Sequence, residues 1–176
     1  EEAGVDVWYD TLACLPIMED GRCAGVEVEN KSGRGALRAA VTVDATGDAD
    51  LAYRAGAACE DGVNNLSVWS LEISLDKVRK AAEDGHLESF LQTARYGMWR
   101  RPDEVDGHWR FEGIDGKQVS DYMLKGRSLV REAFKKRADQ NPDERHQWFP
   151  ACLPAMAQFR RTRCIRGRST LRPEDM

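Results

Sequence analysis

The sequence lacks the residue patterns on which several common site types depend. Its five cysteines include no C-x-x-C pair and its three histidines lie apart from them. Neither a zinc site nor a disulfide framework is therefore expected, and no residue is assigned as a metal ligand. There is no G-x-S-x-G turn and no paired-carboxylate spacing, so no nucleophile stands out. The odd number of cysteines predicts buried, small apolar side chains in a reducing, cytoplasmic compartment.

Two further absences concern binding partners. No apolar run approaches the length of a membrane span and no charged-then-apolar leader is present, so we expect no membrane partner. A net charge of −4 gives no reason to expect a nucleic-acid partner. All seven cations after residue 140 are arginines, which predicts either a local anion site or a salt-bridged surface.

What the sequence does contain is concentrated in residues 41–56. Val41–Val43 is β-branched and alternating, as in a short buried strand. Gly47 follows in a tight turn, and Asp48 or Asp50 can cap a short helix. A strand that runs into a helix leaves unpaired N–H groups at the turn, where anionic or hydroxyl-rich ligands bind. The alternative is an ordinary strand–turn–helix corner with a capping aspartate.

The residues before this stretch predict an antiparallel β-meander over Gly4–Arg38. Val5–Tyr9 and Val26–Glu29 alternate as strands do, and Asp20-Gly21 is a strong hairpin signal. The residues after it predict strands mixed with amphipathic helices. The expected elements are a strand over Leu66–Leu75, helices over Asp76–Glu83, His86–Tyr96 and Val119–Ala138, and a short strand over His108–Ile114. The fold class is therefore α+β (mixed α/β).

The string D-A-T-G-D-A-D-L-A-Y-R-A-G-A, residues 44–57, resembles the second flavin-contacting motif of FAD-dependent oxidoreductases of the glutathione-reductase-like type. Residues 3–57 also match the antiparallel excursion that precedes this motif in that family. The tail resembles the family's R-E-T-R-R-I-v-G-e-y-t-L signature, although Arg161 and Cys164 depart from it. The matching positions are Arg160, Thr162, Arg163, Ile165, Gly167, Thr170 and Leu171.

The resemblance implies FAD as the cofactor and a small-molecule substrate as the partner. It assigns four residues of the turn to cofactor binding, with the last one on a ribityl hydroxyl: Ala45, Thr46, Gly47 and Asp48. We also expect a catalytic role for Arg163, because a guanidinium can fork onto a carboxylate or a flavin oxygen and stabilise reduced flavin. The alternative for Arg163 is a structural ion pair. Arg160 has the same prospects with less support.

No G-x-G-x-x-G follows a strand in this sequence, whereas in the resembled family that turn lies at the extreme N-terminus and binds the ADP part of FAD. The sequence also begins with Glu1 rather than methionine. We therefore expect an internal fragment, with residues 1–61 a partial FAD-binding domain that holds the meander and the edge of a dinucleotide-binding fold. Residues 62–176 are expected to form a partial substrate or cap domain. Such a fragment alone should bind FAD weakly or not at all and be inactive, because the part that binds ADP is missing.

The expected function of the parent protein is oxidation of a small organic substrate by hydride transfer to flavin. The alternative is a non-enzymatic binding or interaction module that shares only a strand–turn–helix corner with the flavoenzymes. An upstream G-x-G-x-x-G in the reading frame would favour the flavoenzyme, and a start codon just before Glu1 would favour the module.

Overall fold

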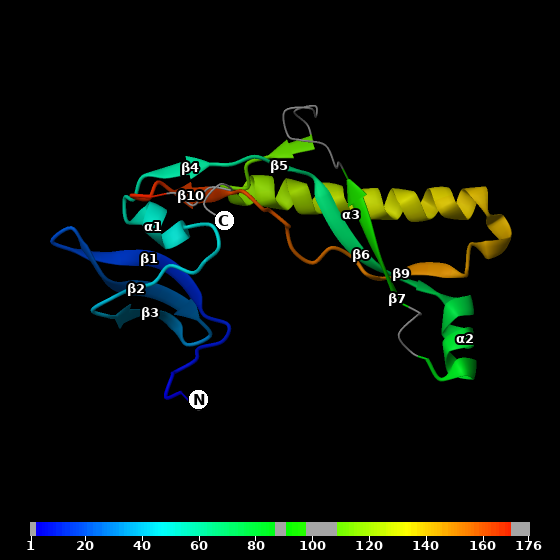
Figure 1. The fold of residues 1–176 in the computed structure, drawn as a ribbon, viewed down its shortest axis with the longest axis horizontal. Coiled ribbons are helices and arrows are strands. Elements are labelled where there is room, and N and C mark those ends of the chain that lie inside the picture. Colours follow the sequence, from blue (N-terminus) through cyan, green and yellow to red (C-terminus); the bar gives the residue numbers. More distant parts are fainter. Residues whose placement is uncertain (1–2, 87–90, 98–108, 170–176) are drawn as a thin grey trace. The chain divides into compact units, whose positions relative to one another are not determined.

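The computed structural model describes residues 3–86, 91–97 and 109–169, and it has the α+β architecture expected from the sequence (Figure 1). The chain forms two compact units. The first unit comprises Glu1–Asp61 together with Arg163–Met176, and the second unit comprises Gly62–Thr162. Each unit has its own strands and its own helices.

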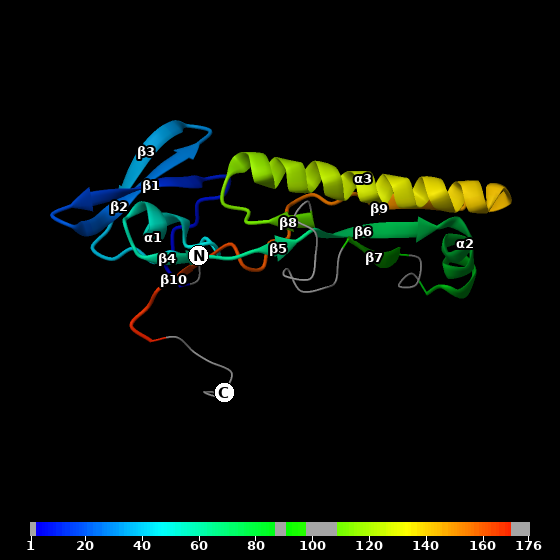
Figure 2. The same ribbon diagram turned by 90° about the horizontal axis from the view of Figure 1, so that it is seen from above.

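The first unit is built on a three-stranded antiparallel sheet of β1 (Leu12–Glu19), β2 (Arg22–Asn30) and β3 (Gly33–Arg38), in that order. Figure 2 shows these strands as a meander. At the β1–β2 turn, Asp20 and Gly21 have φ angles of 48° and 74°. Positive φ at both central residues defines a type I′ hairpin turn. The Asp-Gly signal in the sequence therefore predicted this turn correctly.

Two strands expected in the first unit are not formed. Val5–Tyr9 and Val41–Val43 both lie outside any strand, and the residues Val41 and Val43 are 77% and 82% exposed. A β-branched sequence favours extended backbone, but a strand also needs a neighbour that bonds its N–H and C=O groups. Within the described ranges neither segment pairs with another strand. The prediction of a buried strand before the turn is therefore wrong.

The rest of the first unit joins two distant parts of the chain. The short helix α1 (Asp50–Arg54) is followed by β4 (Cys59–Asp61), which pairs antiparallel with β10 (Arg163–Ile165). Because of this pairing, the chain from Arg163 onward belongs to the first unit. The compact units share the boundary after Asp61 with the expected domains 1–61 and 62–176, and differ from them from Arg163 onward; the assignment of these domains to FAD and substrate binding stays a prediction.

The second unit has a three-stranded antiparallel sheet of order β7-β6-β9, formed by β6 (Ser67–Ser74), β7 (Leu91–Gly97) and β9 (Trp148–Cys152). The long helix α3 (Gly116–Gln140) runs along β6 and β7 (Figure 2). The shorter elements are α2 (Leu75–Asp84), β5 (Asn64–Asn65), β8 (Arg110–Phe111) and the 3-10 helix η4 (Pro142–Glu144).

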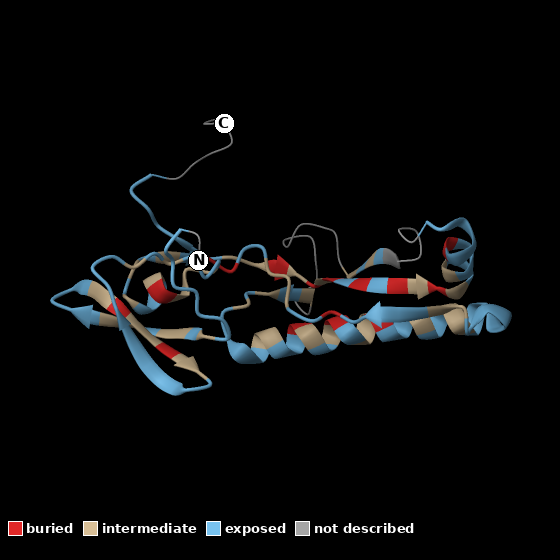
Figure 3. Cartoon of the chain, turned by 90° about the horizontal axis from the view of Figure 1, so that it is seen from below, coloured by how far each residue is buried: buried red, intermediate tan, exposed pale blue. Residues whose placement is uncertain are grey.

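The core of the second unit lies between α3 and β6. Val68 on β6 and Tyr122 and Val130 on α3 are completely buried, and Figure 3 shows the buried positions of the two elements facing each other. The Tyr122 hydroxyl adds a polar tie, because it donates to the Ser67 carbonyl and accepts the Ser67 N–H at 3.1 Å. Gly126 lets the helix approach the strand closely, since an added Cβ would lie 2.5 Å from Val68 Cγ1.

The expected helix Val119–Ala138 is confirmed as α3 and extends further at both ends. Its start was missed because the side chain of Asp115 accepts the N–H of Gln118 at 2.8 Å and caps the helix. The expected helix His86–Tyr96 is wrong. β7 occupies its second half, because it pairs with β6 along its whole length and these interstrand bonds outweigh the helical spacing of its apolar residues. Residues 87–90 and His108 lie outside the described residues.

The close approach at Gly126 makes a testable prediction. Gly126→Ala should lower the free energy of unfolding by about 1–3 kcal/mol, because Val68 is β-branched and fully buried and cannot move aside cheaply. Gly116→Ala is the matched control, since an added Cβ there meets nothing within 4 Å. Urea denaturation should show the control unchanged or more stable. Equal midpoints for the two variants would contradict the packing argument.

Candidate functional site

The turn Ala45–Asp48 is organised by the carboxylate of Asp44. Its Oδ1 accepts the Thr46 N–H at 3.0 Å and the Thr46 hydroxyl at 2.8 Å, and its Oδ2 accepts the Ala52 N–H at 2.8 Å. The Thr46 hydroxyl oxygen in turn accepts the Asp50 N–H at 3.1 Å. Through these bonds, Asp44 and Thr46 link the turn Ala45–Asp48 to the N–H groups of the first helical residues of α1. One aspartate and one threonine thus hold the turn and the start of the helix together.

Asp44 is ionised in this arrangement. Partial burial alone would raise the pKa of the Asp44 carboxyl, but hydrogen bonds from the backbone N–H groups of Ala52, Thr46 and Leu51 and from the Thr46 hydroxyl outweigh burial and hold the pKa below its ordinary value. The corner therefore keeps its hydrogen bonds at neutral pH.

The helix cap differs from the expectation. The residue before α1 is Ala49, which has φ 53° and makes no side-chain cap, so neither Asp48 nor Asp50 caps the helix. Asp44 and Thr46 bind the free N–H groups instead. The sequence did contain the relevant signal, because an aspartate two residues before a threonine commonly closes an Asx turn onto the backbone.

The turn is open to a ligand at Gly47. This residue has φ +89°, and an added Cβ would meet nothing within 4 Å, so backbone atoms face open space there. Ala49 is left-handed without being glycine, a backbone strain that is often found at ligand sites. Asp48 is partly buried, and within the described part of the chain its carboxylate has no hydrogen-bond or ion-pair partner. Its oxygens are therefore available as acceptors.

Arg163 lies on β10 with its side chain 7% exposed. Its Nη1 is 3.2 Å from Asp50 Oδ1, its Nε is 3.6 Å from Asp61 Oδ1, and its guanidinium lies 3.9 Å from the centroid of the Tyr53 ring. These contacts are those of an ion pair within the first unit, and the catalytic role of Arg163 stays a prediction. Arg160 lies in the second unit, where it is exposed and its backbone N–H donates to Asn64 Oδ1 at 2.7 Å.

The second unit holds a buried charge of its own. The side chain of Glu72 is 4% exposed, and it accepts from the Tyr96 hydroxyl and from Arg137 Nη1 at 3.2 Å. Burial, reinforced by the bond to Glu72, raises the pKa of Tyr96 well above its ordinary value, so Tyr96 stays a donor. The Arg137 guanidinium lies over the Phe134 and Trp148 rings, 5.2 and 5.0 Å from their centroids. The buried carboxylate of Glu72 thus has its hydrogen-bond donors within the second unit.

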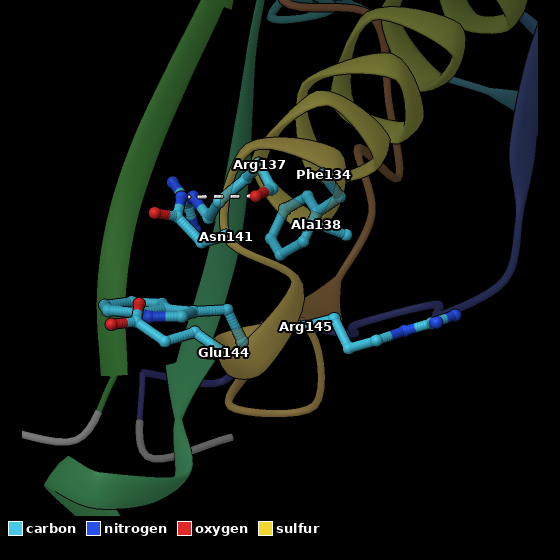
Figure 4. A pocket seen from close by; sticks show the side chains of 7 residues that line it. Phe134, Arg137, Ala138, Asn141, Glu144 and Arg145 are labelled. Carbon is cyan, nitrogen blue, oxygen red and sulfur yellow. Dashed lines mark hydrogen bonds between the residues drawn. The ribbon is translucent and has the colours of Figure 1, made fainter.

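The hollow beside this group is small. Figure 4 shows it at the C-terminal end of α3, where the Asn141 side chain donates to the Arg137 carbonyl at 3.2 Å. Its volume is about 10 Å³, which is room for a single water molecule. Its lining residues are Phe134, Arg137, Ala138, Asn141, Glu144, Arg145 and Trp148. It is too small to admit an organic substrate.

The remaining expectations concern metals, membranes and cysteines. Among residues 3–86, 91–97 and 109–169, no group of three or more His, Cys, Asp or Glu side chains is placed to hold a metal ion. No helix in those ranges is long and apolar enough to span a membrane. The expectation of buried cysteines is wrong, because none of the five is fully buried: three are partly exposed, and Cys152 and Cys164 are exposed. Both lie on strands paired on one side only, β9 and β10.

The low pKa of Asp44 predicts a pH-dependent stability. Asp44→Asn keeps an acceptor for Thr46 but puts an amide group near the Ala52 N–H, and should destabilise the protein by on the order of 1 kcal/mol at pH 7. A lowered pKa gives stability that is present above the unfolded value, near 3.8, and is lost as the pH falls through the folded value. The difference between variant and wild type should therefore shrink at pH 3 and below.

Chemical denaturation at both pH values measures this difference. Asp6→Asn is the charge-matched control, because Asp6 is exposed in the same unit and lies outside any strand or helix. A destabilisation by Asp44→Asn that is the same at pH 7 and pH 2.5 would show that the carboxylate charge is not responsible.

The comparisons with known proteins bear on the same corner. The model of a family described as FAD dependent oxidoreductase matches residues 1–148, a range that includes the turn Ala45–Asp48. No curated protein and no solved structure matches the chain. Because the family match covers most of the 176 residues, the chain belongs to the FAD dependent oxidoreductase family, and the expected FAD cofactor is confirmed.

Proposed function

We propose that the turn Ala45–Asp48 binds the ribityl chain of FAD, with the Asp48 carboxylate accepting a hydrogen bond from a ribityl hydroxyl. The observation that carries this proposal is that the carboxylate of Asp48, which has no partner among the described residues, lies next to the open backbone of Gly47. Ala45 and Thr46 are exposed in the same turn. A polyhydroxyl chain bound at Asp48 can therefore reach both residues.

The charge of the corner favours hydroxyl groups over phosphate. The carboxylates of Asp44 and Asp48 carry negative charge that no arginine or lysine among the described residues pairs with, and a third carboxylate, that of Asp50, is paired with Arg163. A phosphate placed there would be repelled, whereas a hydroxyl donates readily to an ionised carboxylate. The helix that follows has only five residues, too few for a substantial dipole to offset this repulsion. The corner is therefore matched to the sugar-alcohol part of FAD rather than to its pyrophosphate.

The function that follows is flavin-dependent oxidation of a small organic substrate by hydride transfer, in a cytoplasmic enzyme of the glutathione-reductase-like type. FAD supplies the two-electron chemistry when bound. The contribution of this chain is to bind and orient: the first unit holds the flavin side, and the second unit, with its separate sheet and core, forms part of the substrate domain. The competing function is a binding module that shares only the corner.

NMR spectroscopy of the ¹⁵N-labelled protein separates the two functions, because it detects weak as well as tight binding. Adding FAD, or FMN, which has the ribityl chain but no adenosine, should shift the amide signals of Gly47 and Asp48. Adding ADP should leave them in place. Shifts with ADP alone would make the corner a nucleotide site, and no shift with either flavin would favour the binding module.

The role of Asp48 is tested in the same titration. Asp48→Ala removes one charged acceptor, worth about 1.5–3 kcal/mol, and should weaken flavin binding about tenfold or more. Asp6→Ala, an exposed aspartate of the same unit, is the control and should leave the affinity unchanged. Equal affinities for wild type and Asp48→Ala would remove Asp48 from the cofactor site.

A further inference from the structure

The contacts of Arg163 point to a role other than contact with the flavin. Its guanidinium is almost completely buried, and two of its three contacts, Asp50 and Tyr53, belong to α1. The third, Asp61, belongs to β4. The backbone of Arg163 is fixed opposite Asp61 in the β4–β10 pairing. One side chain therefore connects α1 to the small sheet beside it.

Stability alone does not account for a buried arginine here. Taking a guanidinium out of water costs about as much as its ion pairs return, so an apolar side chain could hold the same position equally well. The two carboxylates remain 42% and 54% exposed, and Arg163 Nε has no hydrogen-bond partner among the described residues. What the arginine adds is a fixed orientation of its partners, because the planar guanidinium group sets the angle at which hydrogen-bond acceptors approach it.

The helix that Arg163 contacts is too short to be stable without contacts to other segments. α1 has five residues, starts after a left-handed Ala49 and has no side-chain cap from that residue. Its first residue, Asp50, donates its N–H to Thr46 and shares its carboxylate with Arg163. The path from β10 to the turn thus runs through two consecutive contacts, Arg163 to Asp50 and Asp50 to Thr46.

We propose that Arg163 is a positioning residue that orients the turn Ala45–Asp48 through Asp50, without touching the flavin. This inference rests on the proposed flavin site. Arg163 also neutralises the Asp50 carboxylate, which leaves Asp48 as the unpaired acceptor of the corner. The role differs from the catalytic contact with a carboxylate or a flavin oxygen that we expected from the sequence, because it is exerted from inside the first unit.

The test compares the two carboxylates that share the guanidinium. Asp50→Asn and Asp61→Asn each remove one charge from Arg163 at similar exposure, but only Asp50 leads to the turn. In the ligand-free protein, Asp50→Asn and Arg163→Met should shift the amide signals of Gly47 and Asp48, and Asp61→Asn should not. Both shifting variants should weaken FMN binding by about five- to tenfold, and Asp61→Asn by less than twofold.

A double-mutant cycle separates positioning from general destabilisation. If Arg163 acts through Asp50, the double variant Asp50→Asn/Arg163→Met should bind FMN no more weakly than either single variant. Additive losses, or an Asp61→Asn effect equal to that of Asp50→Asn, would overturn the inference. If Arg163→Met does not fold, Arg163→Lys, which keeps the charge but loses the fork, replaces it in the cycle. Failure of the wild type to bind FMN would count against the proposed flavin site, whereas the ligand-free shifts test Arg163 independently.

Discussion

The corner of the first unit depends on one ionised carboxylate that accepts hydrogen bonds from both sides of a turn. Asp44 accepts hydrogen bonds from Thr46 within the turn and from Ala52 in the helix that follows it. Without these bonds, a five-residue helix entered through a left-handed alanine would keep only its side-chain contacts, among them the ion pair of Asp50 with Arg163. Asp44 therefore fixes the turn in which the backbone of Gly47 and the carboxylate of Asp48 are open to a ligand.

Local sequence signals were reliable where the structure depends on neighbouring residues. The Asp-Gly hairpin, the meander strands from Leu12 onward and the long helix α3 all follow from turn chemistry or from the spacing of apolar residues. The same signals were wrong where the structure depends on a segment that is distant in the sequence. The second half of the expected helix His86–Tyr96 is a strand because it pairs with β6, and Val41–Val43 forms no strand because no described strand lies beside it.

The candidate site was predictable in its position but not in its internal construction. The motif located the turn, and the family match includes it. The helix start was assigned to Asp48 or Asp50 because these two aspartates lie next to the helix in the sequence, whereas Asp44 and Thr46 carry an Asx-turn signal that the assignment did not use. The sequence could not place Arg163, whose partners lie about a hundred residues away and meet it only through the β4–β10 pairing.

That pairing has a consequence for how the protein is made. The first unit is discontinuous: β4 ends at Asp61, and its partner β10 begins at Arg163. At a synthesis rate of about 5–20 residues per second, β10 is made roughly 5–20 seconds after β4. In that interval β4 has no strand to pair with, and the carboxylate of Asp50 has no arginine to pair with. The second unit, being continuous in sequence, can fold first, and the flavin corner is completed last.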